Sequence, residues 1–183
     1  MDVVSNITNE ILVVGSIYKS PDLFIENGHN IRSKYDFHDE STKFFYDNAE
    51  IIYQTRSQKF NRSIVSTYMA EDEERLSLYK KYGGWKLIES WMSLAVPENF
   101  AGYYEVLKKY SLLREYQKNG FDVEKIMAHP KFELLSAMDI YRLIRSKADR
   151  IHTVILTNEE AEILNSNIQS TLLHCMVTPD LGI

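Results

Sequence analysis

Apolar residues along this 183-residue chain recur mostly at intervals of three and four positions, and strict alternation is nowhere sustained. This spacing puts them on one face of α-helices, so the pattern predicts an all-α protein. Only 7 glycines and 4 prolines interrupt it. The expected helices cover approximately residues 9–19, 21–28, 39–54, 63–69, 71–82, 85–94, 99–119, 122–128, 136–155 and 158–173.

Several helix ends carry local signals of their own. Asp39 is a good N-cap for the helix that follows it, and Gly83-Gly84 separates two helices. Asn119-Gly120 is the pair expected at a helix C-terminus. Ser136 and Asp139 have the spacing of a capping box, so a helix is expected to begin there.

Pro97 marks a change in the character of the sequence. We expect residues 1–96 to form a small multi-helix head and residues 97–156 to form a projecting antiparallel helical hairpin. Residues 157–183 then form a linker helix and the start of a connection to a further domain. Leu164, Ile168 and Leu172 lie on one side of the linker helix and are its expected interface.

The stretch NFAGYYEVLKKYSLLREYQKNG, residues 99–120, has more large side chains than one buried stripe needs. Its candidate interface residues are Phe100, Tyr103, Tyr104, Val106, Leu107, Tyr110 and Leu113. In the second hairpin helix an apolar seam at steps of three and four includes Tyr141, Ile144, Ala148 and Ile151. A two-helix hairpin cannot bury both stripes of its first helix, so we expect a second molecule to cover one of them. The alternative is that the hairpin folds back on the head and completes one core.

The net charge, the cysteine content and the length of the apolar runs exclude some classes of function. The formal net charge of −5 and a pI near 5.6 argue against a broad basic surface for nucleic acid, so contact with DNA is expected only indirectly. A single cysteine excludes an internal disulfide and is consistent with a cytoplasmic protein. No apolar run approaches the roughly 20 residues that span a bilayer.

Four segments in order resemble the amino-terminal domain of the DnaB-type replicative DNA helicases. They are GSIYKSPDLF at 15–24, KFFYDNAEIIYQ at 43–54, YGGWKLIESWMSL at 82–94 and the 99–120 stretch quoted above. The resemblance covers roughly residues 9–156. No single motif in it is specific, and the ordered set carries the resemblance.

The resemblance implies a non-catalytic collar. Such domains pair through their hairpins into a ring of three dimers, above a ring of ATPase domains, and they dock primase or a helicase loader. The linker helix would pack on a neighbouring subunit's ATPase domain. Expected partners are therefore further copies of this chain, as a dimer or as a hexamer of the full-length protein, together with primase or a loader.

The chain departs from a complete helicase in one decisive respect. It has no G-x-x-x-x-G-K-[ST] motif, so the phosphate cradle for ATP hydrolysis is missing. We expect no catalytic residue and no cofactor in this chain, with ATP and Mg²⁺ belonging to a longer parent helicase. The alternative is a free-standing helical adaptor, such as a helicase loader or a phage protein that binds a host helicase.

The segment 121–135, interrupted by Pro130, is longer than the hairpin tip of the family. This difference puts primase docking in doubt and favours a phage or mobile-element version.

Other candidate chemistry is sparse. The five histidines show no metal-ligand spacing, so no metal site is expected. Arg142, Arg145, Lys147 and Arg150 make the second hairpin helix locally basic. These four basic residues form either the solvated face of the helix or a surface that binds DNA or an acidic partner.

Overall fold

A computed structural model describes residues 4–27 and 30–155, and within these ranges every regular element is a helix. This confirms the all-α prediction. The elements are α1 (Ile7–Lys19), α2 (Leu23–Asn27), α3 (Ser33–Asp36), α4 (Glu40–Thr55), α5 (Arg62–Ala70), α6 (Glu73–Lys81), α7 (Gly84–Leu94), the 3-10 turn η2 (Pro97–Asn99), α8 (Phe100–Lys118), α9 (Val123–Met127), the 3-10 turn η3 (Phe132–Leu134) and α10 (Ala137–Ile155). They belong to two compact units, Met1–Ile140 and Tyr141–Ile183, which are described separately below. No described helix is both long and apolar enough to cross a membrane.

The predicted helix signals form the expected local contacts. The Asp39 side chain accepts hydrogen bonds from the backbone N–H groups of Ser41 and Thr42, at 3.0 and 2.9 Å. Gly120 has a φ of 81°, the left-handed conformation that ends a helix after Asn119. Ser136 and Asp139 each bond the other's backbone N–H at 3.1 Å, which is the predicted capping box.

Two local expectations were incomplete. The helix after Ser20 begins at Leu23 rather than Pro21, because residues 21–22 form a turn. The polar stretch before Asp39 contains a short helix, α3, that periodicity did not predict. Four residues are too few to show a helical repeat.

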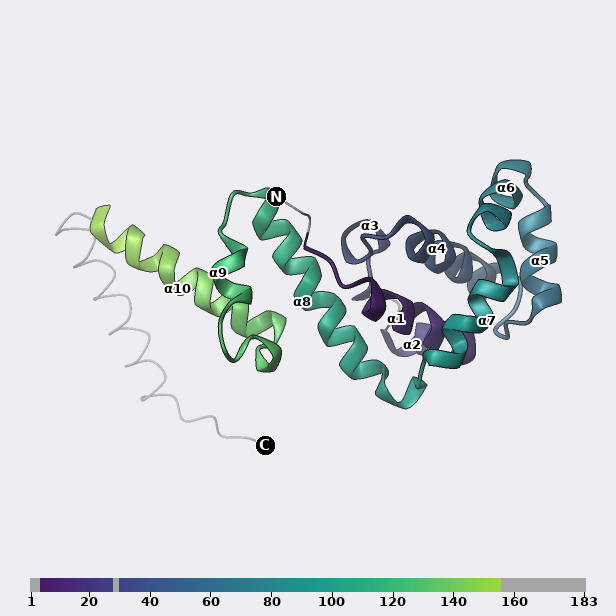
Figure 1. The fold of residues 1–183 in the computed structure, drawn as a ribbon, viewed down its shortest axis with the longest axis horizontal. Helices are drawn as coiled ribbons and strands as arrows, with labels where there is room; N and C mark the ends of the chain where they lie inside the picture. The colour runs from purple at the N-terminus through teal and green to yellow at the C-terminus, as the bar shows by residue number, and fades with distance from the viewer. Residues whose placement is uncertain (1–3, 28–29, 156–183) are drawn as a thin grey trace, which may run out of the picture. The chain divides into compact units, whose positions relative to one another are not determined.

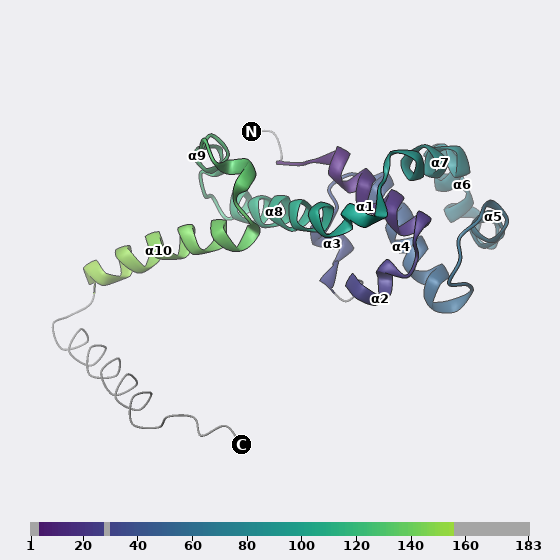
Figure 2. The ribbon, with the colours of Figure 1, turned by 90° about the horizontal axis from the view of Figure 1, so that it is seen from below.

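The first unit is built around α1. Helices α4, α7 and α8 all pack against α1, as both views of the ribbon show (Figure 1, Figure 2). Phe45 of α4 lies at the centre of an aromatic cluster, with its ring edge-on to Tyr18 and Trp91 at centroid distances of 6.5 and 5.4 Å. These rings are fully or nearly fully buried, and aromatic side chains of this size each bury a large apolar area.

Helix α8 belongs to this unit. It packs on α1 and α3, and its residues Phe100 and Leu107 are members of the same buried core as Phe45. The compact unit therefore runs past the boundary expected at Pro97. For α8 alone, this packing agrees with the alternative that the hairpin folds back on the head and completes one core.

Gly15 allows α1 and α7 to approach closely. A Cβ atom at residue 15 would lie 2.4 Å from the carbonyl oxygen of Trp91 and 3.1 Å from the Cβ of Ala95. The first distance is far inside van der Waals contact, and a backbone atom cannot rotate away as a side chain can. Only glycine fits at this crossing.

We predict that Gly15→Ala lowers the free energy of unfolding by about 1–3 kcal/mol, because the added methyl group forces the two helices apart. Urea denaturation followed by circular dichroism measures this. The matched control is Gly102→Ala in α8, where the new Cβ would meet nothing within 4 Å. There the same change should be neutral or stabilise by up to about 1 kcal/mol. Equal effects at the two sites would contradict the close crossing.

Candidate protein interface

Three of the predicted interface residues in α8 are buried within this chain. Phe100, Leu107 and Leu113 are between 0 and 3% exposed. A side chain that its own chain already covers does not need a second molecule, so the expectation that a partner covers these three residues was wrong. The physical reason is that α8 lies against α1 and α3 instead of standing free.

The other predicted α8 residues, Tyr103, Tyr104, Val106 and Tyr110, are half-buried. The ring of Tyr110 lies edge-on to that of Phe132, with centroids 6.3 Å apart. Burial, followed by the charge of Glu133, raises the pKa of Tyr110 above its ordinary value. Part of each of these side chains remains accessible, and contact with a partner there stays a prediction.

A buried ion network fixes α8 in place. The Glu10 carboxylate of α1 accepts hydrogen bonds from the backbone N–H groups of His38 and Asp39, at 2.9 and 3.1 Å, and from the Thr42 hydroxyl at 2.7 Å. Arg114 of α8 places its Nη1 atom 3.8 Å from the same carboxylate. Both side chains are at most 5% exposed, so their attraction is weakly screened by water.

The second guanidinium nitrogen of Arg114 reaches α3. It donates to the carbonyl oxygens of Tyr35 and Asp36, at 3.0 and 2.7 Å. Burial lowers the pKa of Arg114 from its ordinary value, while the nearby Glu10 and Asp36 act in the opposite direction. Arg114 therefore joins α1, α3 and α8 through one side chain.

The network extends nearly two turns back along α8, to Lys108. Its ammonium group lies 2.6 Å from the Asp36 carboxylate, which also accepts a hydrogen bond from the backbone N–H of Arg32 at 2.7 Å. The neighbouring Lys109 is itself buried and donates to the carbonyl oxygens of Phe132 and Glu133, at 3.2 and 3.4 Å. These bonds attach the loop after α9 to the same helix.

Sequence reasoning missed this network, although one signal was present. Phe100, Leu107 and Arg114 are spaced seven apart, so Arg114 occupies a position on the buried stripe of α8. A charge at an apolar position of a helix indicates either a break in the stripe or a buried ion pair. Choosing between these requires knowledge of Glu10, which the local pattern does not supply.

The second unit contains the described remainder of α10, whose exposed apolar residues are now the best-supported candidate interface. On the predicted seam Tyr141 is 41% exposed and Ala148 is exposed as well, whereas Ile144 is 8% exposed. Leu143 is 47% exposed but lies about 160° around the helix from Tyr141. Ile151 lies in the helix, but its side chain is outside the described residues, as are Leu164, Ile168 and Leu172 of the predicted linker helix. Pairing of α10 with α8 in an antiparallel hairpin stays a prediction.

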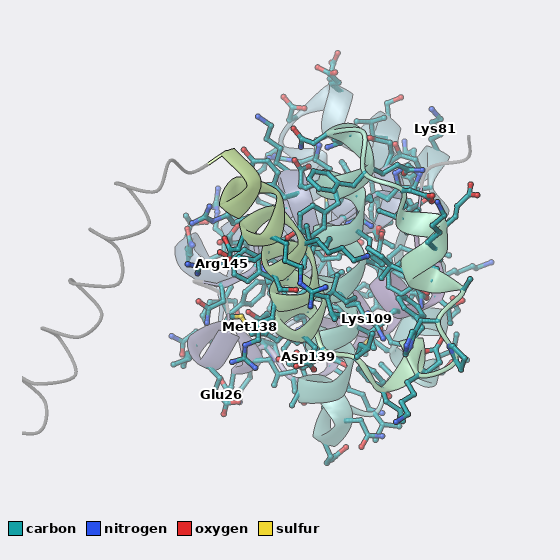
Figure 3. The ribbon with its side chains drawn as sticks, turned by 90° about the vertical axis from the view of Figure 1, so that its left-hand side faces the viewer. Glu26, Lys81, Lys109, Met138, Asp139 and Arg145 are labelled. Carbon is teal, nitrogen blue, oxygen red and sulfur yellow. The ribbon has the colours of Figure 1, made fainter. Side chains whose placement is uncertain are left out.

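The other face of α10 is polar and largely basic. Figure 3 labels Met138 and Asp139 in the first turn of α10 and Arg145 further along it. Arg145 lies 3.8 Å from Asp149 at the i,i+4 spacing, with both side chains more than 60% exposed. Arg142, Lys147 and Arg150 are exposed too. The helix is therefore amphipathic, with an apolar face that is partly uncovered.

Comparison with known proteins gives one distant relative. The chain is 29% identical over 116 residues to the SPbeta prophage-derived uncharacterized protein YorI of Bacillus subtilis strain 168. That match covers 63% of this chain but only 23% of the relative, so this chain spans less than a quarter of the length of that protein. No family model matches the chain. No solved structure matches it.

Within residues 4–27 and 30–155, no three His, Cys, Asp or Glu side chains gather closely enough to hold a metal ion. The buried polar groups of this part of the chain are instead concentrated in the Arg114 network. Their contacts join helices to one another, so these groups stabilise the fold. Side chains that could contact a partner lie on the surface.

We predict that Arg114→Met lowers the free energy of unfolding by about 3–5 kcal/mol, because it leaves the buried Glu10 carboxylate without its cation. Methionine keeps most of the side-chain volume, so the loss reports charge and hydrogen bonding. Urea denaturation measures the change.

The matched control is Arg56→Met. Arg56 pairs with Glu71 at 2.8 Å, but both side chains are at least 40% exposed. Solvent screening limits such a pair to about 0–1 kcal/mol. A loss at Arg114 no larger than the loss at Arg56 would show that the buried network does not hold α8.

Proposed function

We propose that this chain is the amino-terminal collar domain of a hexameric, DnaB-type replicative DNA helicase in the cytoplasm. In this role it is non-catalytic. It pairs with a second copy, helps to assemble the ring and provides a docking surface for primase or a helicase loader. ATP and Mg²⁺ are used by the motor domain of the parent protein, and DNA is met only through the assembled ring.

One observation carries the proposal: α10 has an apolar stripe that the described chain leaves partly uncovered. On this stripe Tyr141 is 41% exposed and Ala148 is exposed as well, while most of the other residues of the helix are charged. An amphipathic helix with such a face is stabilised when it packs against another helix. A second copy of α10 offers an identical face, as a symmetric dimer requires.

Two further findings support the assignment. The four segments that resemble the helicase domain form α1, α4, α7 and α8, and these helices make up one compact head. The relative in the SPbeta prophage is more than four times the length of the matched segment. In that protein, therefore, the matched segment is one part of a larger chain, as a collar domain would be.

We predict that the chain self-associates and that Tyr141→Glu raises the dissociation constant at least about tenfold. Removing one large apolar contact from a helix interface costs about 1.5–3 kcal/mol, and every 1.4 kcal/mol corresponds to a factor of ten. Sedimentation equilibrium over a range of concentrations measures the constant. Ala148→Glu, on the same stripe, should weaken association in the same direction.

Leu143→Glu is the matched control, since Leu143 is a 47% exposed apolar residue of the same helix. It lies two positions after Tyr141, about 160° away around the helix at 100° per residue. The added charge there should leave the dissociation constant within about twofold, a change well below 1.4 kcal/mol. A wild-type chain that stays monomeric at all concentrations, or equal effects of the two substitutions, would contradict the α10 interface.

The link to a motor domain has its own test. We expect the reading frame to continue after the codon for Ile183 into a sequence with a G-x-x-x-x-G-K-[ST] motif, which supplies the phosphate cradle for ATP. Sequencing the gene downstream of this codon checks it. A stop codon there would favour the free-standing adaptor, and binding of the purified chain to a separate helicase would then identify its partner.

A further inference from the structure

A small polar pocket lies between α8 and the segment that leads into α3. Its volume is about 350 Å³, and it is lined by Asn30, Arg32, Tyr35, Asp36, Tyr104 and Lys108. The pocket is part of the first unit, and none of its lining residues belongs to α10. A cavity of this size accommodates a side chain or a small ligand.

The floor of the pocket is held rigidly. Asp36 is buried, and its carboxylate is occupied by the ammonium group of Lys108 at 2.6 Å and by the backbone N–H of Arg32 at 2.7 Å. Arg114 holds the carbonyl oxygens of Tyr35 and Asp36 from behind. The groups around the pocket are therefore positioned before any ligand arrives, which reduces the entropy lost on binding.

The accessible groups at the pocket are mainly donors. The Arg32 guanidinium has no hydrogen bond or ion pair to any residue in the described part of the chain. The Tyr104 hydroxyl is protonated at neutral pH and able to donate, and burial, followed by the charges of Asp36 and Glu105, raises its pKa further. Because Lys108 already neutralises Asp36, the lining has one positive charge in excess, carried by Arg32.

We propose that this pocket binds a single carboxylate of a partner protein, an Asp or Glu side chain flanked by an apolar or aromatic residue. The planar guanidinium of Arg32 matches a carboxylate through two parallel hydrogen bonds. The ring of Tyr35, 43% exposed, and that of Tyr104 provide flat apolar walls for the flanking residue. Arg32 sets the specificity for charge, and the two tyrosines set the specificity for the neighbouring side chain.

A nucleic-acid strand fits these observations less well. Binding a polyanion depends on several cations that neutralise successive phosphates. Here the lining has two cations, of which Lys108 is already paired, and the whole chain has a formal net charge of −5. One isolated carboxylate matches the single positive charge in excess.

The test is a titration of the ¹⁵N-labelled full chain, followed by NMR, with the blocked dipeptide acetyl-Tyr-Glu-amide and its neutral counterpart acetyl-Tyr-Gln-amide. The proposal predicts saturable shifts of the Arg32 Nε–H and of the Tyr35 and Tyr104 signals with the Glu peptide. The Gln peptide should bind at least about fivefold more weakly, because a neutral amide forms no charge-assisted pair with Arg32.

Two variants distinguish binding in the pocket from a general effect of the net charge. Arg32→Gln should weaken binding of the Glu peptide at least about fivefold, since it removes the charge-assisted contact. Lys86→Gln removes the same charge from an exposed residue of α7 that does not line the pocket, and it should change the affinity less than about twofold. Equal binding of the two peptides, or equal losses in the two variants, would overturn the proposal. Tighter binding of an eight-nucleotide oligo(dT) than of the Glu peptide would also overturn it and favour nucleic acid.

Discussion

The attraction between Arg114 and Glu10 is the constraint on which the arrangement of this chain depends. Both side chains are buried, and neither charge can be left without the other at a cost below several kcal/mol. The carboxylate is saturated by the amides and hydroxyl that precede and begin α4, while the guanidinium also bonds the carbonyl oxygens that end α3. One pair therefore fixes the positions of α1, α3 and α8 and orients the start of α4.

This constraint changes where partners can bind. Because α8 is held in the head, Phe100, Leu107 and Leu113 are buried within this chain, and Leu113 has no exposed surface at all. Part of the apolar stripe of α10 is uncovered instead, at Tyr141 and Ala148. The pocket beside Arg32 is a second consequence, since the same network that holds α3 against α8 also forms its floor. The proposed assembly surface and the proposed carboxylate site are thus independent of each other.

Much of the local structure could be predicted from the sequence, because its causes are local. Asp39, Gly120 and the Ser136–Asp139 pair each act within a few residues, and the helices they limit were expected close to where they lie. The apolar stripe of α10 likewise depends only on helical periodicity. What such a pattern cannot state is whether a stripe is covered, since that depends on segments far away in the chain.

The candidate site shows this limit most clearly. Arg114 looks like an ordinary solvated charge within the Leu-Leu-Arg-Glu segment, and only the fold brings Glu10 to it. Without that contact, α8 has too many large side chains for a lone helix, which is why a second molecule was expected to cover it. The short helix α3 is too short to show a helical repeat, and its Asp36 is held by contacts with Lys108 and Arg114 of the distant α8. The pocket that these residues line could not be inferred from a polar stretch.

Native-state hydrogen exchange is the most direct measurement of the central claim that α8 is an integral part of the head. Amides of residues 107–114 should exchange with the same free energy of opening as the core amides of α1 and α4, because cooperative packing makes one unfolding unit. The protection should also be independent of protein concentration. If the amides of α8 exchange much faster than those of α1, or become protected only as the concentration rises, the helix is held by a second molecule and this account is wrong.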